Sequence, residues 1–131
     1  MAAGVPLNDG RTAEAREILQ AVIRRSPRDP YMSTFLRFIA MSYYYGGDFA
    51  NAVEAAKRAV AFQPDNPMQY RWLAASLGQL GLTDQARDAL RRAIDLSPDT
   101  FDVYVRKRPP WFRPEDHELM LDGLRKAGWE A

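Results

Sequence analysis

The sequence predicts an all-α fold built from repeated pairs of antiparallel helices, and three observations predict it. The stretch GDFANAVEAAKRAVAFQPDN at 47–66 returns, with substitutions, as GLTDQARDALRRAIDLSPDT at 81–100. Apolar residues recur at helical spacing along most of the chain, and no stretch alternates with the period of two that a strand requires. The breaks between these helical stretches are only a few residues long, so consecutive helices should lie antiparallel.

The composition of the 131 residues narrows the function classes. The formal net charge is +1, so no general field favours nucleic acid or an anionic membrane. No cysteine is present, which excludes disulfides, thiolate nucleophiles and cysteine-based zinc sites. The N-terminus does not have the pattern of a signal peptide, and no apolar run approaches the roughly 20 residues that span a bilayer. We therefore expect one domain in the cytoplasm, without membrane contact.

The first two helices are predicted from their start and stop signals. Residues 8–10 (NDG) can start the first helix and Ser26-Pro27 can end it. Asp29-Pro30 is a natural start for the second, because aspartate accepts hydrogen bonds from first-turn amides and proline needs no amide there. This aromatic-rich helix should run to Tyr45 and end at Gly46-Gly47. The apolar stripe of the first helix consists of Ala15, Ile18, Leu19, Val22 and Ile23.

The next three helices follow the same capping rules. Asp48 can open the third helix, which ends before Asn66-Pro67. Asn66-Pro67 can cap the fourth helix, and Gly81 can end it. The fifth should begin at Thr83 or Asp84.

The C-terminal segment is expected to cover the helices before it. The fifth helix should end at Ser97-Pro98; the apolar pattern then continues briefly, and Pro109-Pro110 breaks it. A last helix should begin near Pro114 and be capped by Gly128 in a Schellman arrangement. Its apolar stripe, suited to covering the final repeat, consists of Met120, Leu121, Leu124 and Ala127.

Two helices in every 34 residues is the period of the tetratricopeptide repeat (TPR), and the residues resemble the pattern of that family. The resemblance implies a TPR-like α-solenoid of antiparallel helix hairpins with a C-terminal capping helix. We expect a single domain over 1–131, with a half repeat at 11–27, repeats at 33–66 and 67–100, and a capping segment at 101–131. The half repeat further suggests a fragment of a longer chain. The matching residues are Leu36, Ile39, Ala40, Tyr43, Ala52, Ala56, Ala59 and Pro64, then Tyr70, Leu73, Ala74, Leu77, Ala86, Leu90, Ala93 and Pro98.

The tail narrows the resemblance further. From Ser26 onward the chain is similar to the C-terminal repeat region of bacterial class III adenylate or guanylate cyclases, most specifically in PEDHELMLDGLRKAGW at 114–129. The resemblance implies a regulatory or scaffolding region of a protein that makes cyclic AMP from ATP in signal transduction. The catalytic domain of such cyclases is absent from these residues, so we expect no enzyme activity, cofactor or metal site in this chain.

Side chains on the first helix of each repeat are expected to line a concave groove that binds a protein or peptide. Arg37 and Arg71 would set the orientation of the partner, since arginine and aromatic residues anchor many interfaces. Packing of these side chains against neighbouring helices is an equally good interpretation. The carboxylate clamp of some repeats is not expected, because Met41 and Ala75 replace its asparagine. The candidate groove residues are Thr34, Arg37, Met41, Tyr44, Tyr45, Met68, Arg71 and Gln79.

Other interpretations of the sequence remain open or are unfavoured. The groove could hold upstream domains of the same chain, or the region could be a dimerisation or spacer element or a free-standing adaptor. His117, the one histidine, is expected at a solvated helix start. Nucleic-acid binding is not expected, because acidic residues are almost as numerous as basic ones and only Trp111 and Phe112 lie beside a basic cluster.

Overall fold

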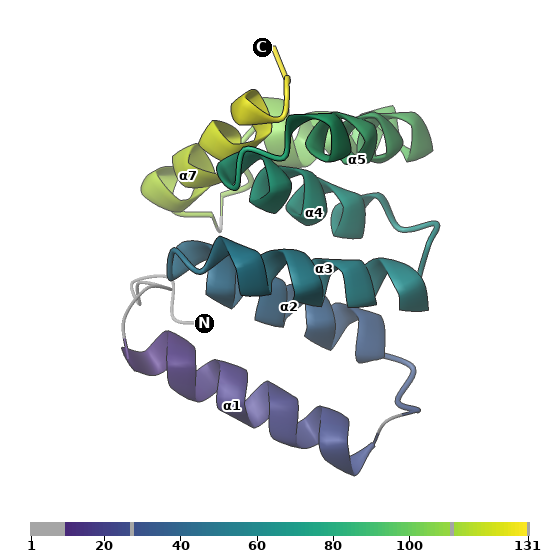
Figure 1. The fold of residues 1–131 in the computed structure, drawn as a ribbon, viewed down its shortest axis with the longest axis vertical. Coiled ribbons are helices and arrows are strands. Elements are labelled where there is room, and N and C mark those ends of the chain that lie inside the picture. Colours follow the sequence, from purple (N-terminus) through teal and green to yellow (C-terminus); the bar gives the residue numbers. More distant parts are fainter. Residues whose placement is uncertain (1–9, 27, 111, 131) are drawn as a thin grey trace.

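The computed structural model describes residues 10–26, 28–110 and 112–130 (Figure 1). The described residues form helices and connecting turns, with no strand among them, so the predicted all-α class is confirmed. Three features named from the sequence lie outside the described residues, namely Asn8-Asp9, Pro27 and Trp111. The elements are α1 (Gly10–Arg25), α2 (Met32–Tyr45), α3 (Phe49–Phe62), α4 (Pro67–Gln79), α5 (Thr83–Leu96), α6 (Pro98–Phe101), the π-helical η1 (Asp102–Arg106) and α7 (Pro114–Lys126).

The helices stack as antiparallel pairs along the long axis of the molecule. In Figure 1, α1 lies at one end, α2 and α3 form the next pair, and α4 and α5 the pair after it. The closest packing occurs within the pairs α2–α3 and α4–α5, while α3 packs against α4 between the pairs. Small residues permit this close approach of helices. Four of them, Ala40, Ala52, Ala74 and Ala86, are 0–1% exposed.

The helix boundaries follow local capping chemistry at most of the expected places. The side chain of Asp48 accepts a hydrogen bond from the Asn51 amide, and that of Asn66 accepts one from the Met68 amide. Gly128 has φ +107°, and the adjoining Trp129 and Gly128 amides donate to the carbonyl groups of Leu124 and Arg125. This is the expected Schellman arrangement at the end of α7.

The start of α2 differs from the expectation. The helix begins at Met32 rather than at Asp29-Pro30. The Asp29 carboxylate accepts a hydrogen bond from the Tyr31 amide at 2.7 Å, and the Met32 amide donates to the Asp29 carbonyl at 3.0 Å. These bonds form a separate turn before the helix, so α2 begins a few residues later than expected.

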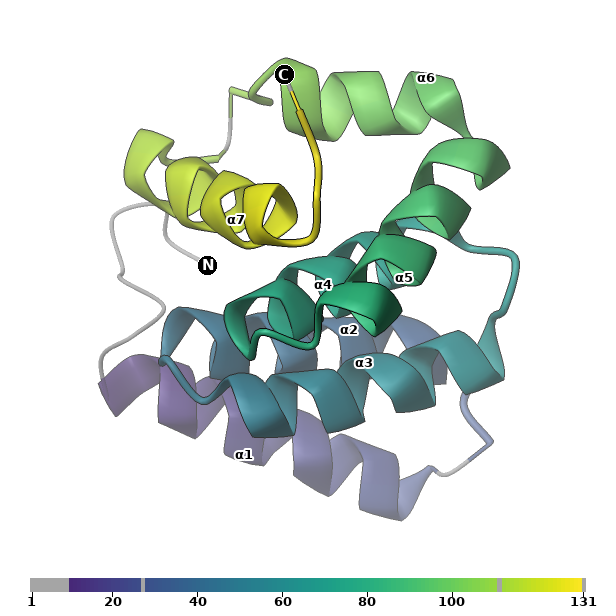
Figure 2. The same ribbon diagram turned by 45° about the horizontal axis from the view of Figure 1, so that its top comes forward.

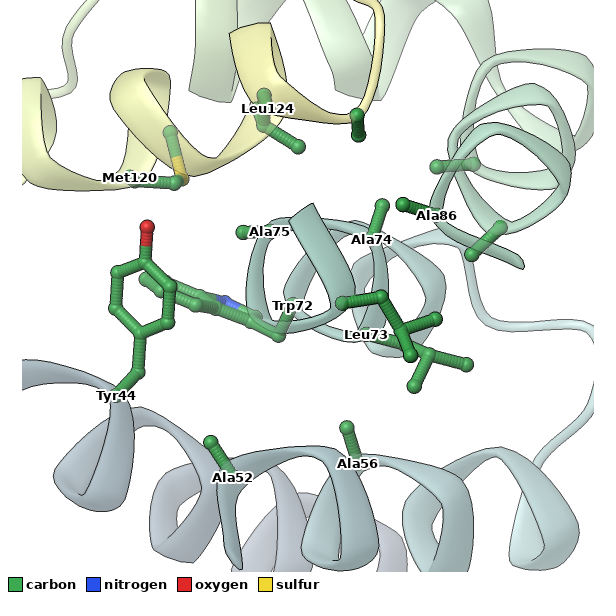
Figure 3. Close-up of a cluster of buried hydrophobic side chains, with 14 of the residues drawn as sticks. Tyr44, Ala52, Ala56, Trp72, Leu73, Ala74, Ala75, Ala86, Met120 and Leu124 are labelled. Atoms are coloured by element: carbon green, nitrogen blue, oxygen red, sulfur yellow. The ribbon is translucent and has the colours of Figure 1, made fainter. Parts of the chain in front are cut away.

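The C-terminal helix α7 lies along α4, between α6–η1 and the end of α2 (Figure 2). Its expected apolar stripe is buried, with Met120, Leu124 and Ala127 at 0% exposure and Leu121 at 9%. The side chains that it meets belong to the same apolar cluster as the repeat pairs (Figure 3). Trp72 lies at the centre of that cluster, in edge-to-face contact with both Tyr44 and Tyr45. The helix α7 is therefore part of the core.

Candidate partner-binding face

The candidate groove residues lie on two neighbouring helices, five on α2 and three on α4. The structure does not expose them equally. Tyr44, Tyr45 and Arg71 are buried, at 0%, 6% and 3% exposure. The expectation that these three face an open groove is wrong, because other elements cover them. The remaining five are half-buried, namely Thr34, Arg37, Met41, Met68 and Gln79.

The buried tyrosines are covered by α7. The Tyr44 hydroxyl donates to the Leu119 carbonyl at 2.5 Å, and the Tyr45 hydroxyl donates to the Asp116 carbonyl at 3.3 Å. Burial raises the pKa of Tyr44 to about 12 and raises the pKa of Tyr45 as well, so both hydroxyl groups stay protonated and can donate. The candidate face is thus filled by α7 at the C-terminal ends of α2 and α4.

Gln79 joins α4 to α7 at the rim of this contact. Its side-chain amide donates to the Asp122 carboxylate at 3.0 Å, and its carbonyl oxygen accepts from the Lys126 ammonium group at 2.9 Å. The hydrogen bonds from Gln79 and Lys126 lower the pKa of Asp122. Gln79 therefore already has partners within the chain, and it holds α7 in place.

Two glycines bring the backbones of α4 and α7 together. A Cβ atom on Gly78 would collide with the Gly123 carbonyl oxygen and lie 3.0 Å from the Ala127 nitrogen. A Cβ atom on Gly123 would collide with the Tyr44 hydroxyl and lie 2.7 Å from the Ala75 carbonyl oxygen. No side chain larger than hydrogen fits at either position unless α7 moves.

The N-terminal halves of α2 and α4 each carry an arginine of the candidate set, Arg37 and Arg71. The guanidinium carbon of Arg71 lies 4.8 Å from the centre of the Tyr104 ring, and its buried Nε has no hydrogen-bond partner. Burial, with Arg37 beside it, lowers the pKa of Arg71 to about 10. Arg37 is half-buried and donates from Nη1 to the Gln69 side-chain oxygen at 3.4 Å. Neither arginine forms an ion pair with any carboxylate of the described residues.

Two residues of this region were not identified from the sequence, Gln69 and Tyr104. Gln69 is fully buried, and its side-chain amide donates to the Ser33 carbonyl at 3.3 Å. A polar residue between apolar neighbours gives little sign of such burial. Tyr104 lies on η1. Its contact with Arg71 depends on how the chain turns after α5. Only the structure brings it to α4.

His117 is buried rather than solvated, so that expectation is wrong. Its side chain is 7% exposed, and its Nε2 donates to the Val105 carbonyl at 3.1 Å. The physical reason is that the first turn of α7 lies against η1, which the local helix-start pattern does not reveal. Burial lowers the pKa of His117, partly offset by the bond to Val105. No group of three or more histidine or acidic side chains in the described ranges is placed to hold a metal ion.

Comparison with known families agrees with this architecture. Residues 39–100 match the model of the tetratricopeptide repeat family. The match supports a TPR domain, and the fold is the predicted TPR-like solenoid of helix pairs. No curated protein matched the chain. Among the helices of the described ranges, none has the length and apolar character needed to cross a membrane.

The family match also bears on the kind of activity. Tetratricopeptide repeats mediate contacts between proteins and are typically not catalytic, so the match supports a protein–protein interaction module. Neither comparison connects the chain with a nucleotide cyclase.

Proposed function

We propose that this chain binds an acidic segment of a partner protein through the part of the concave face that α7 leaves uncovered. The observation that carries the proposal is the arginine pair Arg37 and Arg71, which has no carboxylate partner in the described part of the chain. Phe38 lies beside Arg37 and Tyr104 beside Arg71, and Thr34 and Met68 are half-buried on α2 and α4.

The electrostatics of the pair favour an anionic ligand. Burial lowers the pKa of both arginines, and the positive charge of Arg37 lowers the pKa of Arg71 further. A carboxylate between them would relieve the repulsion and could form charge-assisted hydrogen bonds. Arg37 is half-buried and is the accessible arginine of the pair. The buried Arg71 beside it adds positive potential.

Apolar side chains beside the pair would add affinity. Phe38 is 44% exposed, with the Arg37 guanidinium carbon 5.5 Å from its ring centre. Met68 is half-buried at the start of α4. An acidic segment with neighbouring leucine or phenylalanine side chains would suit this surface, because exposed aromatic and methionine side chains commonly anchor interfaces.

Binding of two matched peptides tests the proposal. A fluorescent peptide that carries two glutamates among leucines should bind, and the same peptide with glutamines should bind more weakly. Arg37→Gln should weaken binding of the acidic peptide by about fivefold, the cost of roughly 1 kcal/mol for a partly exposed charge pair. Fluorescence anisotropy measures the affinity of each peptide for the original chain and for Arg37→Gln. At a higher salt concentration the affinities of the acidic and the glutamine peptide should become more similar, because salt screens the charges.

Arg91→Gln is the matched control for this experiment. Arg91 is exposed on α5, in the part of the second repeat that corresponds to Lys57 of the first. This variant should bind the acidic peptide as the original chain does. Equal affinity of the two peptides, or equal loss in both variants, would contradict the arginine-pair proposal while leaving the fold untouched.

We also propose that the module regulates or positions the catalytic domain of a class III cyclase in the cytoplasm. This proposal depends on the resemblance of the tail at 114–129, since neither comparison connects the chain with cyclases. The native protein, detected by antibody in its source cells, should be several times larger than 14.9 kDa and yield peptides of a cyclase catalytic domain. A native mass near that of this chain would favour the free-standing adaptor instead.

Light scattering tests the alternative that this region is a dimerisation element, because it measures the mass of the particle in solution. A chain that stays monomeric at high concentration would contradict that alternative.

A further inference from the structure

The helix α1 lies at one end of the stack, and no other helix of the described ranges covers its outer face (Figure 1). When the repeats are aligned, Ile18 of α1 corresponds to Ala55 of α3 and to Ala89 of α5. These two alanines are 7% and 6% exposed, whereas Ile18 is 64% exposed. A position that both complete repeats bury is therefore open to solvent on α1, where it carries a larger apolar side chain.

The outer face of α1 has a definite chemical pattern. One line along the helix carries an acidic residue, two apolar residues and a basic residue, namely Glu14, Ile18, Ala21 and Arg25. Their spacing of four, three and four positions places them on the same side of a helix. Arg16, on the opposite side, lies with its guanidinium carbon 4.1 Å from the ring centre of Tyr43 on α2. The line therefore faces away from α2.

This line is complementary to itself when a second copy of the helix runs antiparallel. A two-fold axis midway between Ile18 and Ala21 places each isoleucine opposite the alanine of the other copy. The same axis places Glu14 of each copy opposite Arg25 of the other. Both charged side chains are exposed, and no ion pair between described side chains includes either of them. The small Ala21 would let the two helices approach closely.

We propose that two copies of this chain associate through antiparallel packing of their α1 helices. The apolar contact comes from Ile18, and the charges at the two ends fix the register of the helices. One pair of 16-residue helices makes a small interface, so half of the chains should be paired at roughly 0.1 mM. This interface goes beyond the proposed partner binding, because it uses α1, whereas the partner-binding face is formed by α2 and α4.

Sedimentation equilibrium of the full chain tests the proposal between about 10 µM and about 1 mM. The apparent mass should rise with concentration from 14.9 kDa toward that of two chains. Ile18→Glu should weaken association at least about tenfold, because the apolar contact is lost in both copies. Val103→Glu is the matched control, since Val103 is also an exposed β-branched side chain, at 47%, but lies on η1. Its association should equal that of the original chain.

Charge reversal tests the antiparallel register. Glu14→Arg and Arg25→Glu each place like charges opposite one another, so each variant alone should associate about fivefold more weakly. An equal mixture of the two variants should recover association, because the mixed dimer has opposite charges at both ends. This recovery also separates a lost interface from a damaged fold, since mixing does not repair a damaged helix.

Three results would overturn the proposal. They are a mass that stays at that of one chain up to about 1 mM, equal weakening by Ile18→Glu and Val103→Glu, and no recovery when the charge variants are mixed. The acidic peptide should bind Ile18→Glu as it binds the original chain. Failure of the dimer and failure of the proposed partner binding are therefore distinguishable.

Discussion

His117 is an ionisable residue whose burial should be visible in the stability of the protein. Its pKa is lowered in the folded chain from an ordinary value of 6.5, so the unfolded chain binds more protons between the two values. The free energy of unfolding should therefore be unaffected by this group above about pH 6.5 and fall as the pH drops below it.

Urea unfolding between about pH 7.5 and about pH 5 measures this dependence, with His117→Gln as the comparison. Since the variant keeps every carboxylate, the difference between the two curves isolates the histidine. We expect the original chain to lose more stability than the variant on acidification. Parallel curves would show that His117 is not buried as a neutral ring.

Individual residues show which features the sequence could reveal. Asp48 and Asn66 were recognisable as helix caps because capping depends on neighbours within the same turn. The burial of His117 and Tyr44 was not recognisable, because each is covered by a different element, His117 by η1 and Tyr44 by α7. Local chemistry fixes what a residue can do, and packing between elements decides whether it is exposed.

At the scale of elements, the contact between α4 and α7 depends on the absence of side chains at Gly78 and Gly123. Gly78→Ala should destabilise the protein by about 1–3 kcal/mol, since its Cβ would meet the backbone of α7 rather than a movable side chain. Denaturant unfolding measures the change. Gly123→Ala should have an effect of similar size because it meets the Tyr44 hydroxyl and Ala75.

Gly46→Ala is the control for these two substitutions. Gly46 ends α2 with right-handed helical angles, and a Cβ there would lie 3.3 Å from the Ser42 carbonyl of its own helix. Its substitution should change stability by less than about 1 kcal/mol. If Gly78→Ala costs no more than Gly46→Ala, the close packing of α7 on α4 is contradicted.

The sequence predicted that α7 exists, where it begins and which of its faces is apolar. Its stripe, from Met120 to Ala127, shows that this face must be covered but not which surface covers it. The placement along α4, with the end of α2 beneath it, follows from Gly78, Gly123 and the two tyrosine hydroxyl groups together. That combination could not be inferred from helical spacing.

Across the whole molecule, stability should decrease toward α1. The main apolar cluster is built from buried residues of α2 and the elements after it, while α1 contributes Leu19 and Ile23 as partly buried neighbours. Arg16 helps to hold α1, with its guanidinium carbon 4.1 Å from the ring centre of Tyr43. Few buried contacts imply low local stability.

Hydrogen exchange followed by mass spectrometry tests this gradient. Amides of α1 should exchange first, and those of α4, which packs against α3, α5 and α7, should exchange last. Loss of the aromatic contact in Arg16→Ala should speed exchange in α1 and leave α4 unchanged. Protection in α1 equal to that in α4 would contradict the gradient.

The central claim is that α7 fills one part of the candidate face and leaves the half-buried Arg37 accessible to a partner, with the buried Arg71 beside it. Backbone NMR of the full chain, titrated with the acidic peptide and its glutamine counterpart, tests it most directly. The account predicts that the acidic peptide shifts the amide resonances around Arg37, Phe38, Met68 and Tyr104, while those around Gly78 and Gly123 stay in place. Shifts concentrated on α7 and the end of α4 would contradict it, because they would mean that the peptide competes with α7 for the same surface.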